Sequence, residues 1–595
     1  MSHLFLKKEI NQLIADAEDP EVEGGHIDSG FKRTLGPISI TMLGIGAIIG
    51  AGIFTLTGKA AANYGGPGII YSFVISGAMC TMAGLCYAEM AAMIPVSGSA
   101  YAYAYATMGE GIAWIMGLLL VLNYAFGAGA VVNGWSSYLL SLLRTTGLTL
   151  SDPLLYYTKG PWELVTLGGG QQVHGFWNVP ASLIVIIITA ILYRGITASA
   201  KLNSIIVITN VTIIVLFIAL GISVVSSTNI HVNPNVTGLA NLVPAREIII
   251  DATGHQIARY GWLRGGVLTG AGVVFFAFIG FDSVSTVAQE AKRPKRDIPI
   301  GIMASLLICT ILYVLVAFTL TGVVSYKDLD VSDPIALGID QIVILRNWNN
   351  TAKAVLTFTV KLGALAGLSS VVLVNILSQT RIFYAMAKDK LLPWFEALHP
   401  RYQSPHVATI FTGVFVTVCG GLMPINLVAN LVSLGTLLVF LLVCVSVPLM
   451  NYINPNVERS FRVPYPRLVG TVGAVSCFRI MISMDLETWA YLISWLTLGF
   501  GLYCLYGRRH SLQQKTRGFK FGPLWMDYVG LGLQLFGIAG LALVFLRANP
   551  SKSSLLPLAS HTSVSIAIAG SAVTIVCGLW ITLTNVKKQG SKTMT

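Results

Sequence analysis

Apolar residues come along this chain in blocks about 20 residues long, separated by short polar segments. A helix of about 20 apolar residues is long enough to cross the hydrocarbon core of a bilayer. The blocks show no alternation of polar and apolar residues, and a backbone in lipid must satisfy its own hydrogen bonds, so we expect helices rather than strands. The predicted spans, about fourteen in number, are 36–58, 68–94, 111–142, 178–194, 203–226, 266–289, 299–324, 354–380, 407–423, 427–450, 468–484, 487–507, 526–546 and 564–585. The predicted fold class is therefore an all-α integral membrane protein.

The order of the spans predicts two blocks of five followed by four accessory spans at the C-terminal end. Because each block holds an odd number of spans, the second block enters the membrane from the opposite side, which makes the two blocks an inverted repeat. The predicted domains are a cytoplasmic N-terminal tail (1–35), the first repeat (36–226), an external loop with the second repeat (227–450), the accessory spans (451–585) and a cytoplasmic C-terminal tail (586–595). Residues 95–110 and 381–406 are predicted to form short helices along the membrane surface.

The first span of each block contains an interruption. One reads GIGAIIGAGIF over 44–54, and the other reads FFAFIGFD over 275–282. Glycine clusters also serve close helix packing, but interruptions at matching positions of two inverted halves indicate a substrate site near the bilayer midplane. A half-helix that starts near Ala51 and Gly52 would direct free N–H groups and its positive dipole end toward a carboxylate. We therefore expect the first and sixth helices to be broken around such a site.

Composition and charge placement support a membrane protein and exclude one other class. Hydrophobic residues make up 54% of the chain and charged residues 11%, against roughly a quarter charged in soluble proteins. The net charge is +12, but the basic residues gather on one predicted face, for example at 292–296 and 508–509. Such a bias marks the cytoplasmic side, so both termini are predicted to be cytoplasmic and nucleic-acid binding is not expected.

The cysteine and histidine residues predict neither disulfides nor a metal site. All eight cysteines lie within apolar blocks, so a disulfide framework is not expected. The nine histidines lie in predicted tails and loops, without the spacing of metal ligands. We expect no cofactor and no enzymatic activity.

Four motifs together resemble a known family. The interruptions at 44–54 and 275–282, the segment PVSGSAY at 95–101 and the segment RIFYAMA at 381–387 are similar to motifs of the cationic amino acid transporters. That family belongs to the amino acid–polyamine–organocation superfamily, and the resemblance extends over about residues 30–450. It implies fourteen spans, a five-plus-five inverted-repeat core that works by alternating access, and an α-amino acid held between the first and sixth spans.

The resemblance also implies the groups that bind this amino acid. By motif position, the substrate carboxylate would accept hydrogen bonds from the N–H groups of Ala51 and Gly52. The substrate ammonium would donate to main-chain carbonyls, namely those of Ile48, Phe276, Ala277 and Ile279. Two broken helices can in this way bind both ends of a zwitterion without a buried protein charge.

Three further residues are gating or coupling candidates, each with a structural alternative. Asp282 either touches the site or caps the inner half of the sixth span, and the cap is favoured because a carboxylate at that depth needs partners. Glu110 opens the third span, where an acid suits the helix dipole, but the matching glutamate in the cationic members is linked to transport. Phe281 belongs either to the core or to an aromatic group that shields the pocket from solvent.

One position in the fifth span indicates whether transport is coupled to protons. Several bacterial relatives have a lysine there, whereas counting from the run SAKLN at 199–203 gives Asn210 in this chain, as in eukaryotic cationic members. An asparagine cannot titrate, so uniport or exchange is predicted, with Asn210 bracing the fifth span against Ser369 or Ser370. The alternative is a proton-coupled symporter, in which Asp282 or Glu89 would carry the proton.

Amino acid transport across a plasma membrane is the predicted function, either in a bacterial inner membrane or at a eukaryotic surface. Cationic and small neutral L-amino acids are the candidate substrates. Cationic ones are favoured only slightly, since no intramembrane acidic pair obviously awaits a basic side chain. The competing functions are an amino-acid-sensing receptor and, less well supported, a channel, for which filter segments are lacking. The expected partners are the amino acid and membrane lipid, and the oligomeric state is left open.

Overall fold

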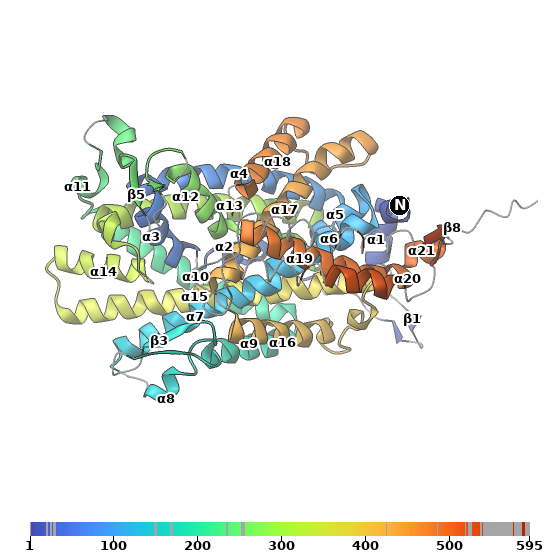
Figure 1. Ribbon diagram of the computed structural model, residues 1–595, viewed down its shortest axis with the longest axis horizontal. Helices are drawn as coiled ribbons and strands as arrows, with labels where there is room; N and C mark the ends of the chain where they lie inside the picture. The colour runs from blue at the N-terminus through green and yellow to red at the C-terminus, as the bar shows by residue number, and fades with distance from the viewer. Residues whose placement is uncertain are drawn as a thin grey trace, which may run out of the picture.

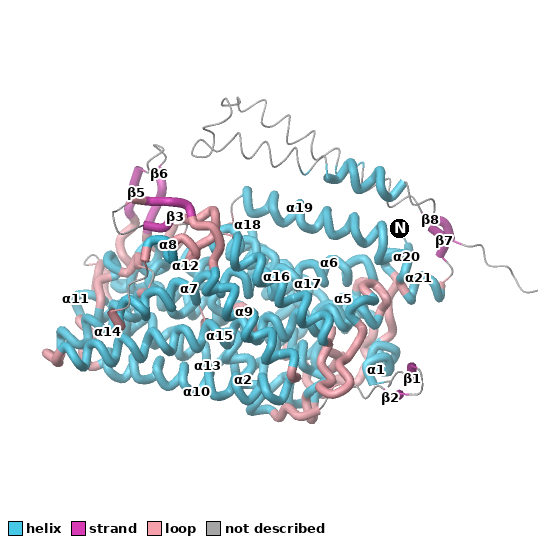
Figure 2. Tube along the Cα trace, turned by 90° about the horizontal axis from the view of Figure 1, so that it is seen from below, coloured by secondary structure: helices cyan, strands magenta, loops and turns pink. Residues whose placement is uncertain are grey.

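The computed structural model is a long bundle whose helices run mostly along its longest axis (Figure 1). The residues that it describes are 2–18, 22–23, 26–27, 31, 33–50, 52–147, 151–166, 171–233, 236–250, 256–263, 265–331, 333–423, 425–482, 484, 486–517, 519–521, 526–535, 538, 575, 577 and 586–588. In both ribbon and tube views the N-terminus lies beside α20 (Arg508–His510) and α21 (Leu512–Thr516) (Figures 1 and 2). We call this end of the bundle, which is predicted to face the cytoplasm, the inner end.

The membrane helices follow the apolar blocks. The region of the first predicted repeat comprises α2 (Pro37–Ile48), η2 (Gly52–Leu56), α3 (Thr57–Ala60), η3 (Ala61–Gly65), α4 (Ile69–Met93), α6 (Glu110–Val121), η5 (Leu122–Phe126), α7 (Gly127–Thr145), α9 (Val179–Tyr193) and α10 (Ile196–Ile222). The region of the second comprises α12 (Val267–Val274), η7 (Phe275–Phe278), η8 (Phe281–Glu290), α13 (Pro294–Val323), α15 (Asn350–Lys388), α16 (His406–Leu422) and α17 (Ile425–Ile453). After these come α18 (Pro466–Ile482), α19 (Leu486–Leu502) and η11 (Tyr503–Gly507).

Shorter elements connect the membrane helices. Near the inner end lie α1 (Ile10–Glu18), α5 (Ser99–Thr107) and η10 (Pro393–Phe395), and elsewhere η4 (Gly66–Gly68), α8 (Asp152–Leu155), α11 (Ser227–Ile230), η6 (Gly238–Leu242), η9 (Tyr326–Asp328) and α14 (Pro334–Leu345). Within the described residues, four two-stranded antiparallel sheets pair β1 (Val22–Glu23) with β2 (His26–Ile27), β3 (Leu164–Thr166) with β4 (Gln172–His174), β5 (Glu247–Ile250) with β6 (Gln256–Arg259), and β7 (Phe519–Phe521) with β8 (Val586–Lys588).

The first twelve predicted spans all fall on helices, whereas the last two are only partly covered. Within the described residues, eight helical stretches are long and apolar enough to cross a membrane, and three shorter apolar helices accompany them. Residues 526–535 are helical, but most of 536–585 lies outside the described residues, so the count of fourteen stays a prediction. The single surface helix expected at 381–406 is wrong, because α15 continues to Lys388 and a short 3-10 turn follows it. One of the three shorter apolar helices, α14, was not predicted.

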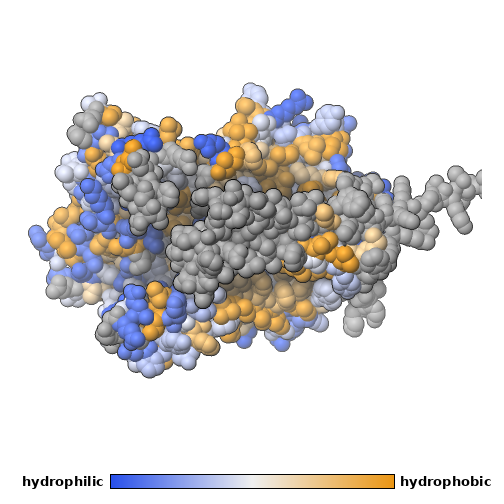
Figure 3. Space-filling view, in the orientation of Figure 1, coloured by the Kyte–Doolittle hydropathy of each residue, from blue (hydrophilic) through white to orange (hydrophobic). Residues whose placement is uncertain are grey.

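Helices from the two predicted repeats pack in two mixed groups. In the first group α13 packs along α4 and α2, and α12 packs on α4. In the second group α15 packs along α7, and α16 packs along α9. α10 contacts α2, α13 and α15 and therefore lies between the groups. Large apolar side chains are exposed on the outside of these helices, as lipid contact requires, and Figure 3 shows several patches of hydrophobic residues on one face.

Candidate functional site

The first membrane helix is interrupted after Ile48. Ile49 has an extended conformation (φ −76°, ψ 95°), and the chain becomes helical again at Gly52 and stays helical to Gly65. Ala51, one of the two predicted carboxylate-binding residues, lies outside the described residues. The first N–H groups of a helix have no partner within it, so the segment that begins at Gly52 has donors near the break.

The sixth helix is interrupted at Ile279 and Gly280. Ile279 is extended, with ψ 133°, and Gly280 has φ 123°, a conformation that residues with a Cβ rarely adopt. A Cβ at Gly280 would also lie 2.6 Å from the carbonyl oxygen of Ala47. Glycine is therefore needed at this position both for the turn and for the close approach to α2.

The two interruptions touch each other and share a tyrosine. A Cβ at Gly52 would lie 2.3 Å from the Cα of Ala277, so the chains are in direct contact there. From α13, the Tyr313 hydroxyl lies 2.7 Å from the carbonyl oxygen of Ile48 and 2.9 Å from that of Ala277. One hydroxyl hydrogen serves only one acceptor at a time. Tyr313 therefore contacts two carbonyls that the resemblance assigns to a substrate ammonium.

A small cavity lies beside this contact. It measures about 30 Å³, which is room for about two water molecules and too little for an amino acid. Four of the six predicted substrate-binding residues line it, while Ala277 is buried behind the wall. The lining residues are Ala47, Ile48, Gly50, Gly52, Asn123, Gly127, Val131, Phe276, Ile279, Val371, Asn375 and Val432. None of these carries a formal charge, and the polar side chains are those of two asparagines.

Asn123 connects the cavity to Asp282. The Asn123 Nδ2 donates a hydrogen bond of 2.8 Å to Asp282 Oδ2, and the Tyr124 hydroxyl donates another of 2.8 Å to the same oxygen. An ionised carboxylate can only accept hydrogen bonds, so the Asn123 amide is oriented with Oδ1 away from it. That Oδ1 has no hydrogen-bond partner among the described residues. It is therefore an available acceptor on a residue of the cavity wall.

Asp282 is completely buried in the first turn of η8. It does not line the cavity, and the start of η8 at Gly280 has no side-chain cap. Its carboxylate instead lies behind Asn123 of the cavity wall. Its contacts come from η5, a single π-helical turn within the third span. Such turns are frequent at functional sites. The Asp282 Oδ1 has no hydrogen-bond partner among the described residues.

Glu110 and Phe281 do not line the cavity. Glu110 lies at the start of α6, where its carboxylate accepts hydrogen bonds from Tyr105, Tyr503, Ser511 and Gln514 at 2.5–2.8 Å. Gln514 lies in α21 and Ser511 directly precedes it, so these two donors attach α21 to the third span. Phe281 is packed in the core, 4.8 Å from the ring of Phe440 and 5.8 Å from the ring of Tyr87. Of the aromatic residues at the second interruption, Phe276 is the one that lines the cavity.

Asn210 does not form the expected brace. It is buried against α15, where a Cβ at Gly367 would lie 2.3 Å from its Nδ2, and its Oδ1 has no partner among the described residues. The bridge is made two turns earlier, by Asn203. The Ser370 hydroxyl donates to Asn203 Oδ1 at 2.6 Å, and Asn203 Nδ2 donates to the Met42 carbonyl at 3.2 Å.

Ser369, the other expected partner, accepts a hydrogen bond from the indole of Trp135 at 2.9 Å. Glu89, the alternative proton carrier, forms a buried ion pair with Arg459, with 3.3 Å between Oε1 and Nε. Its Oε2 also accepts a hydrogen bond of 2.8 Å from the backbone N–H of Val463. Among the described residues, no group of three or more acidic, histidine or cysteine residues is placed to hold a metal ion.

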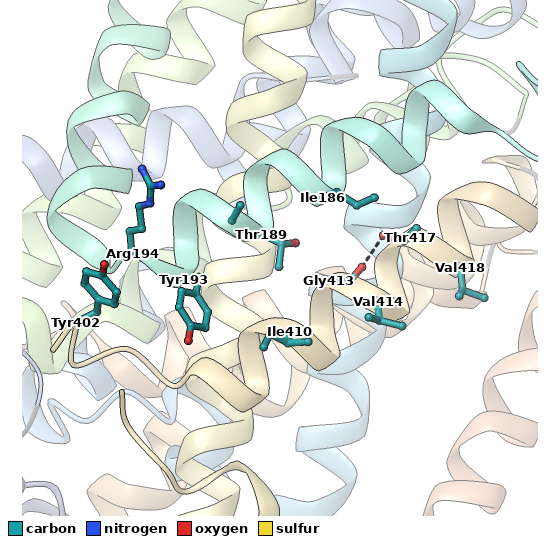
Figure 4. Close-up of a pocket in the computed structure, with 11 residues that line it drawn as sticks. Ile186, Thr189, Tyr193, Arg194, Tyr402, Ile410, Gly413, Val414, Thr417 and Val418 are labelled. Carbon is teal, nitrogen blue, oxygen red and sulfur yellow. Dashed lines mark hydrogen bonds between the residues drawn. The ribbon is translucent and has the colours of Figure 1, made fainter. Parts of the chain in front are cut away.

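A larger hollow lies on the outer surface between α9 and α16, with a volume of about 640 Å³ (Figure 4). Its walls are mostly apolar, and the hydroxyls of Thr189 and Thr417 are hydrogen-bonded to carbonyls of their own helices. In Figure 4 the Arg194 guanidinium points away from the space between the two helices. This groove offers no convergent polar groups for an amino acid and is not the candidate site.

Comparisons with known proteins point to one family. Residues 35–484 match the family described as amino acid permease. The branched-chain amino acid permease BcaP of Bacillus subtilis (strain 168) is 37% identical over 510 residues, which cover 85% of this chain and 98% of the relative. The methylthioribose transporter of the same organism is 34% identical over 516 residues, covering 87% and 100%. The vacuolar cationic amino acid transporter 4 of Arabidopsis thaliana is 32% identical over 442 residues, covering 72% and 64%.

Proposed function

Because this chain belongs to the amino acid permease family and is an amino acid transporter, we propose that it carries a neutral, mainly apolar L-amino acid by alternating access. The expected resemblance to cationic amino acid transporters is confirmed by the relatives. The observation that carries the choice of substrate is the lining of the central cavity. Its side chains are apolar except for Asn123 and Asn375.

The proposed binding mode uses uncharged groups for both charges of the substrate. The N–H groups at the start of the helix from Gly52 receive the carboxylate, where the dipole also favours an anion. The free Oδ1 of Asn123, together with the carbonyls of Phe276 and Ile279, receives the ammonium. The substrate side chain then lies against Val131, beside an apolar wall. A lysine or arginine side chain would find no carboxylate in this lining.

Alternating access accounts for the small volume of the cavity. At about 30 Å³ the cavity is too small for an amino acid, so in this proposal the substrate enters only when the two helix groups separate on one side. Opening toward each side in turn would carry the substrate across. A plasma membrane location with both termini cytoplasmic is part of the proposal and rests on the placement of basic residues.

Uptake into liposomes that contain only the purified protein tests this assignment. We expect leucine, valine and alanine to be taken up, and arginine, lysine and methylthioribose to be taken up much less. Preferential uptake of arginine or of methylthioribose would refute the proposed substrate class, and binding without any uptake would favour a receptor.

A pair of glycine variants tests the location of the site. Gly52→Val places its side chain against Ala277 and should abolish binding, because losing one charge-assisted hydrogen bond costs roughly 1.5–3 kcal/mol. Gly134→Val is the matched control, since a Cβ at Gly134 meets no atom within 4 Å. Undiminished uptake by a well-inserted Gly52→Val protein would exclude this site.

Energy coupling has two candidate forms. Asn210 cannot titrate, which favours uniport or exchange. Asp282 supports the alternative of proton coupling, because it is a fully buried carboxyl with an oxygen that lacks a partner among the described residues. Uptake of a neutral amino acid driven by an imposed pH gradient, with the membrane potential clamped, distinguishes them. Gradient-driven uptake that disappears in Asp282→Asn would establish proton coupling, and indifference to the gradient would establish uniport or exchange.

A further inference from the structure

The first residues of the chain pack into the inner end of the bundle. The backbone N–H of Glu110 donates a hydrogen bond of 3.0 Å to the carbonyl of Leu6. Gly109 has φ 101°, and a Cβ there would lie 2.6 Å from the backbone of Phe5. A glycine thus allows the N-terminal segment (residues 2–8) to lie directly on the turn before the third span.

Lys8 anchors this segment with a buried ion pair. Its ammonium lies 2.6 Å from Asp389 Oδ1, at the end of α15, and the two side chains are 4% and 6% exposed. The other oxygen, Asp389 Oδ2, accepts a hydrogen bond of 2.7 Å from the hydroxyl of Tyr101 on α5. Three separate parts of the chain therefore meet at one carboxylate. The adjacent Lys7, by contrast, is exposed.

The same two elements, α5 and α15, also hold the inner half of the sixth span. The Ser99 and Ser285 hydroxyls lie 2.5 Å apart and join α5 to η8. The Thr286 hydroxyl donates at 3.2 Å to Ser378 on α15, and Arg381 of α15 lies 2.6 Å from Glu290 at the end of η8. A path from the central cavity to the inner side along η8 can open only if these contacts to α5 and α15 separate.

We propose that residues 2–8 form a latch, with Lys8 and Asp389 as its ion pair, that holds the inner pathway closed. The latch joins the turn before the third span to Asp389 at the end of α15, where Tyr101 of α5 is also bound, and so keeps α5 and α15 against η8. Releasing it shifts the protein toward a state open at the inner end. The proposal rests on the alternating access proposed above, but it concerns the resting equilibrium of the protein and needs no substrate.

The experiment measures access to a buried position on the inner pathway. Thr286 has no exposed surface, so Thr286→Cys, in a chain whose exposed Cys577 is replaced by serine, reports opening through its rate of reaction with a hydrophilic maleimide. The same chain without the reporter gives the background from the other seven cysteines, all of which are buried. In this background, Lys8→Gln should raise the alkylation rate by at least about fivefold, the lower end of typical coupling between two sites.

Two further variants make the test specific. Lys7→Gln removes the same charge from an exposed neighbour and should leave the alkylation rate unchanged. The exchange Lys8→Asp with Asp389→Lys should bring the rate back toward that of the parent, because it restores the ion pair with reversed polarity. Tyr101→Phe keeps the ion pair and should therefore raise the alkylation rate less than Lys8→Gln does. This variant replaces the charge exchange as a test if the exchanged protein does not fold.

A purely structural role predicts a different result. If the segment only stabilises the fold, Lys8→Gln lowers the melting temperature while alkylation of folded protein stays at the parent rate. That outcome, or an equal effect of Lys7→Gln, would overturn the latch. Because the readout requires no transport, failure of the latch is distinguishable from failure of the proposed substrate or of alternating access, which uptake assays test separately.

Discussion

At the centre of the molecule the two broken helices meet through main-chain groups and neutral side chains, whereas at the inner end buried ion pairs join the helices. The central Asp282 is held by an asparagine and a tyrosine. At the inner end, Glu290 and Asp389 each face a basic partner at 2.6 Å. A charge is costly at the midplane, and neutral dipoles can bind a zwitterion and release it again.

Buried ion pairs behave differently when they are broken. Separation leaves two uncompensated charges unless water reaches them, so an intermediate, half-separated arrangement is unfavourable. Near the membrane surface, opening admits water and makes the separated state accessible. Ion pairs there favour two discrete states, open and closed, while the centre can adapt to a substrate. Neutral groups at the centre therefore suit substrate binding, and buried ion pairs at the inner end suit control of access.

The largest effect is expected when one charge of an inner ion pair is removed. Glu290→Gln leaves the guanidinium of Arg381 buried and unpaired, which should cost roughly 3–5 kcal/mol in stability. Thermal or denaturant unfolding in detergent measures the loss. Glu458→Gln is the control, because its pair with Lys295 is exposed and exposed pairs contribute about 0–1 kcal/mol. Equal losses of stability in the two variants would show that the buried inner ion pairs stabilise the protein no more than an exposed pair does.

A smaller effect is expected at the centre, where the backbone rather than a charge is constrained. Gly280→Ala must adopt a positive φ, which costs about 1–3 kcal/mol for the conformation alone, and its methyl group also meets α2. We expect lower thermal stability together with a loss of substrate binding. The control Gly134→Ala lies within a helix with open space around it, so it should be neutral or slightly stabilising. Normal binding by Gly280→Ala would contradict the geometry of the interruption.

The smallest effect should come from the neutral hydrogen bonds at the centre. Tyr313→Phe removes the hydroxyl that faces the carbonyls of Ile48 and Ala277, at an expected cost of about 0.5–1.5 kcal/mol. The same change at Tyr71, whose hydroxyl is hydrogen-bonded at the surface, should cost less. Melting temperatures should be measured with and without substrate. The rise caused by substrate should be kept in Tyr313→Phe, because the freed carbonyls can accept hydrogen bonds from the substrate ammonium. If Tyr313→Phe lowered stability as much as Glu290→Gln, the centre would not be held by weaker interactions than the inner end.

The sequence was informative where short-range pattern determines structure. Runs of apolar residues located the first twelve spans. The glycine cluster at 44–54 and the glycine within FFAFIGFD indicated the two interruptions, because glycine weakens a helix and allows backbone conformations that other residues rarely adopt. Four of the six residues assigned to the site through the resemblance do line the cavity. These features depend on neighbouring residues, which a single sequence displays directly.

Contacts between residues far apart in the chain could not be predicted from the sequence. Tyr313 and Ile48 are 265 residues apart, and nothing distinguishes that tyrosine from others in apolar spans. Asn123 likewise looks like an ordinary polar residue in the sequence. The brace was predicted at Asn210 because that position matches the lysine of bacterial relatives, whereas the facing helices, which the sequence does not show, place it at Asn203. The N-terminal segment looked like a solvated tail, since a polar composition does not reveal a partner far along the chain.

The distance between the two halves of the latch has a consequence for biosynthesis. Lys8 and Asp389 are 381 residues apart, and a ribosome adds roughly 5–20 residues per second. The nascent N-terminal segment therefore waits roughly 20–75 s before the carboxylate that will hold it has been made. During that interval the inserted helices have no latch, so a protease or chaperone at the ribosome meets the segment free. Closure at this end is one of the later steps in the maturation of the protein, although it involves the first residues to be synthesised.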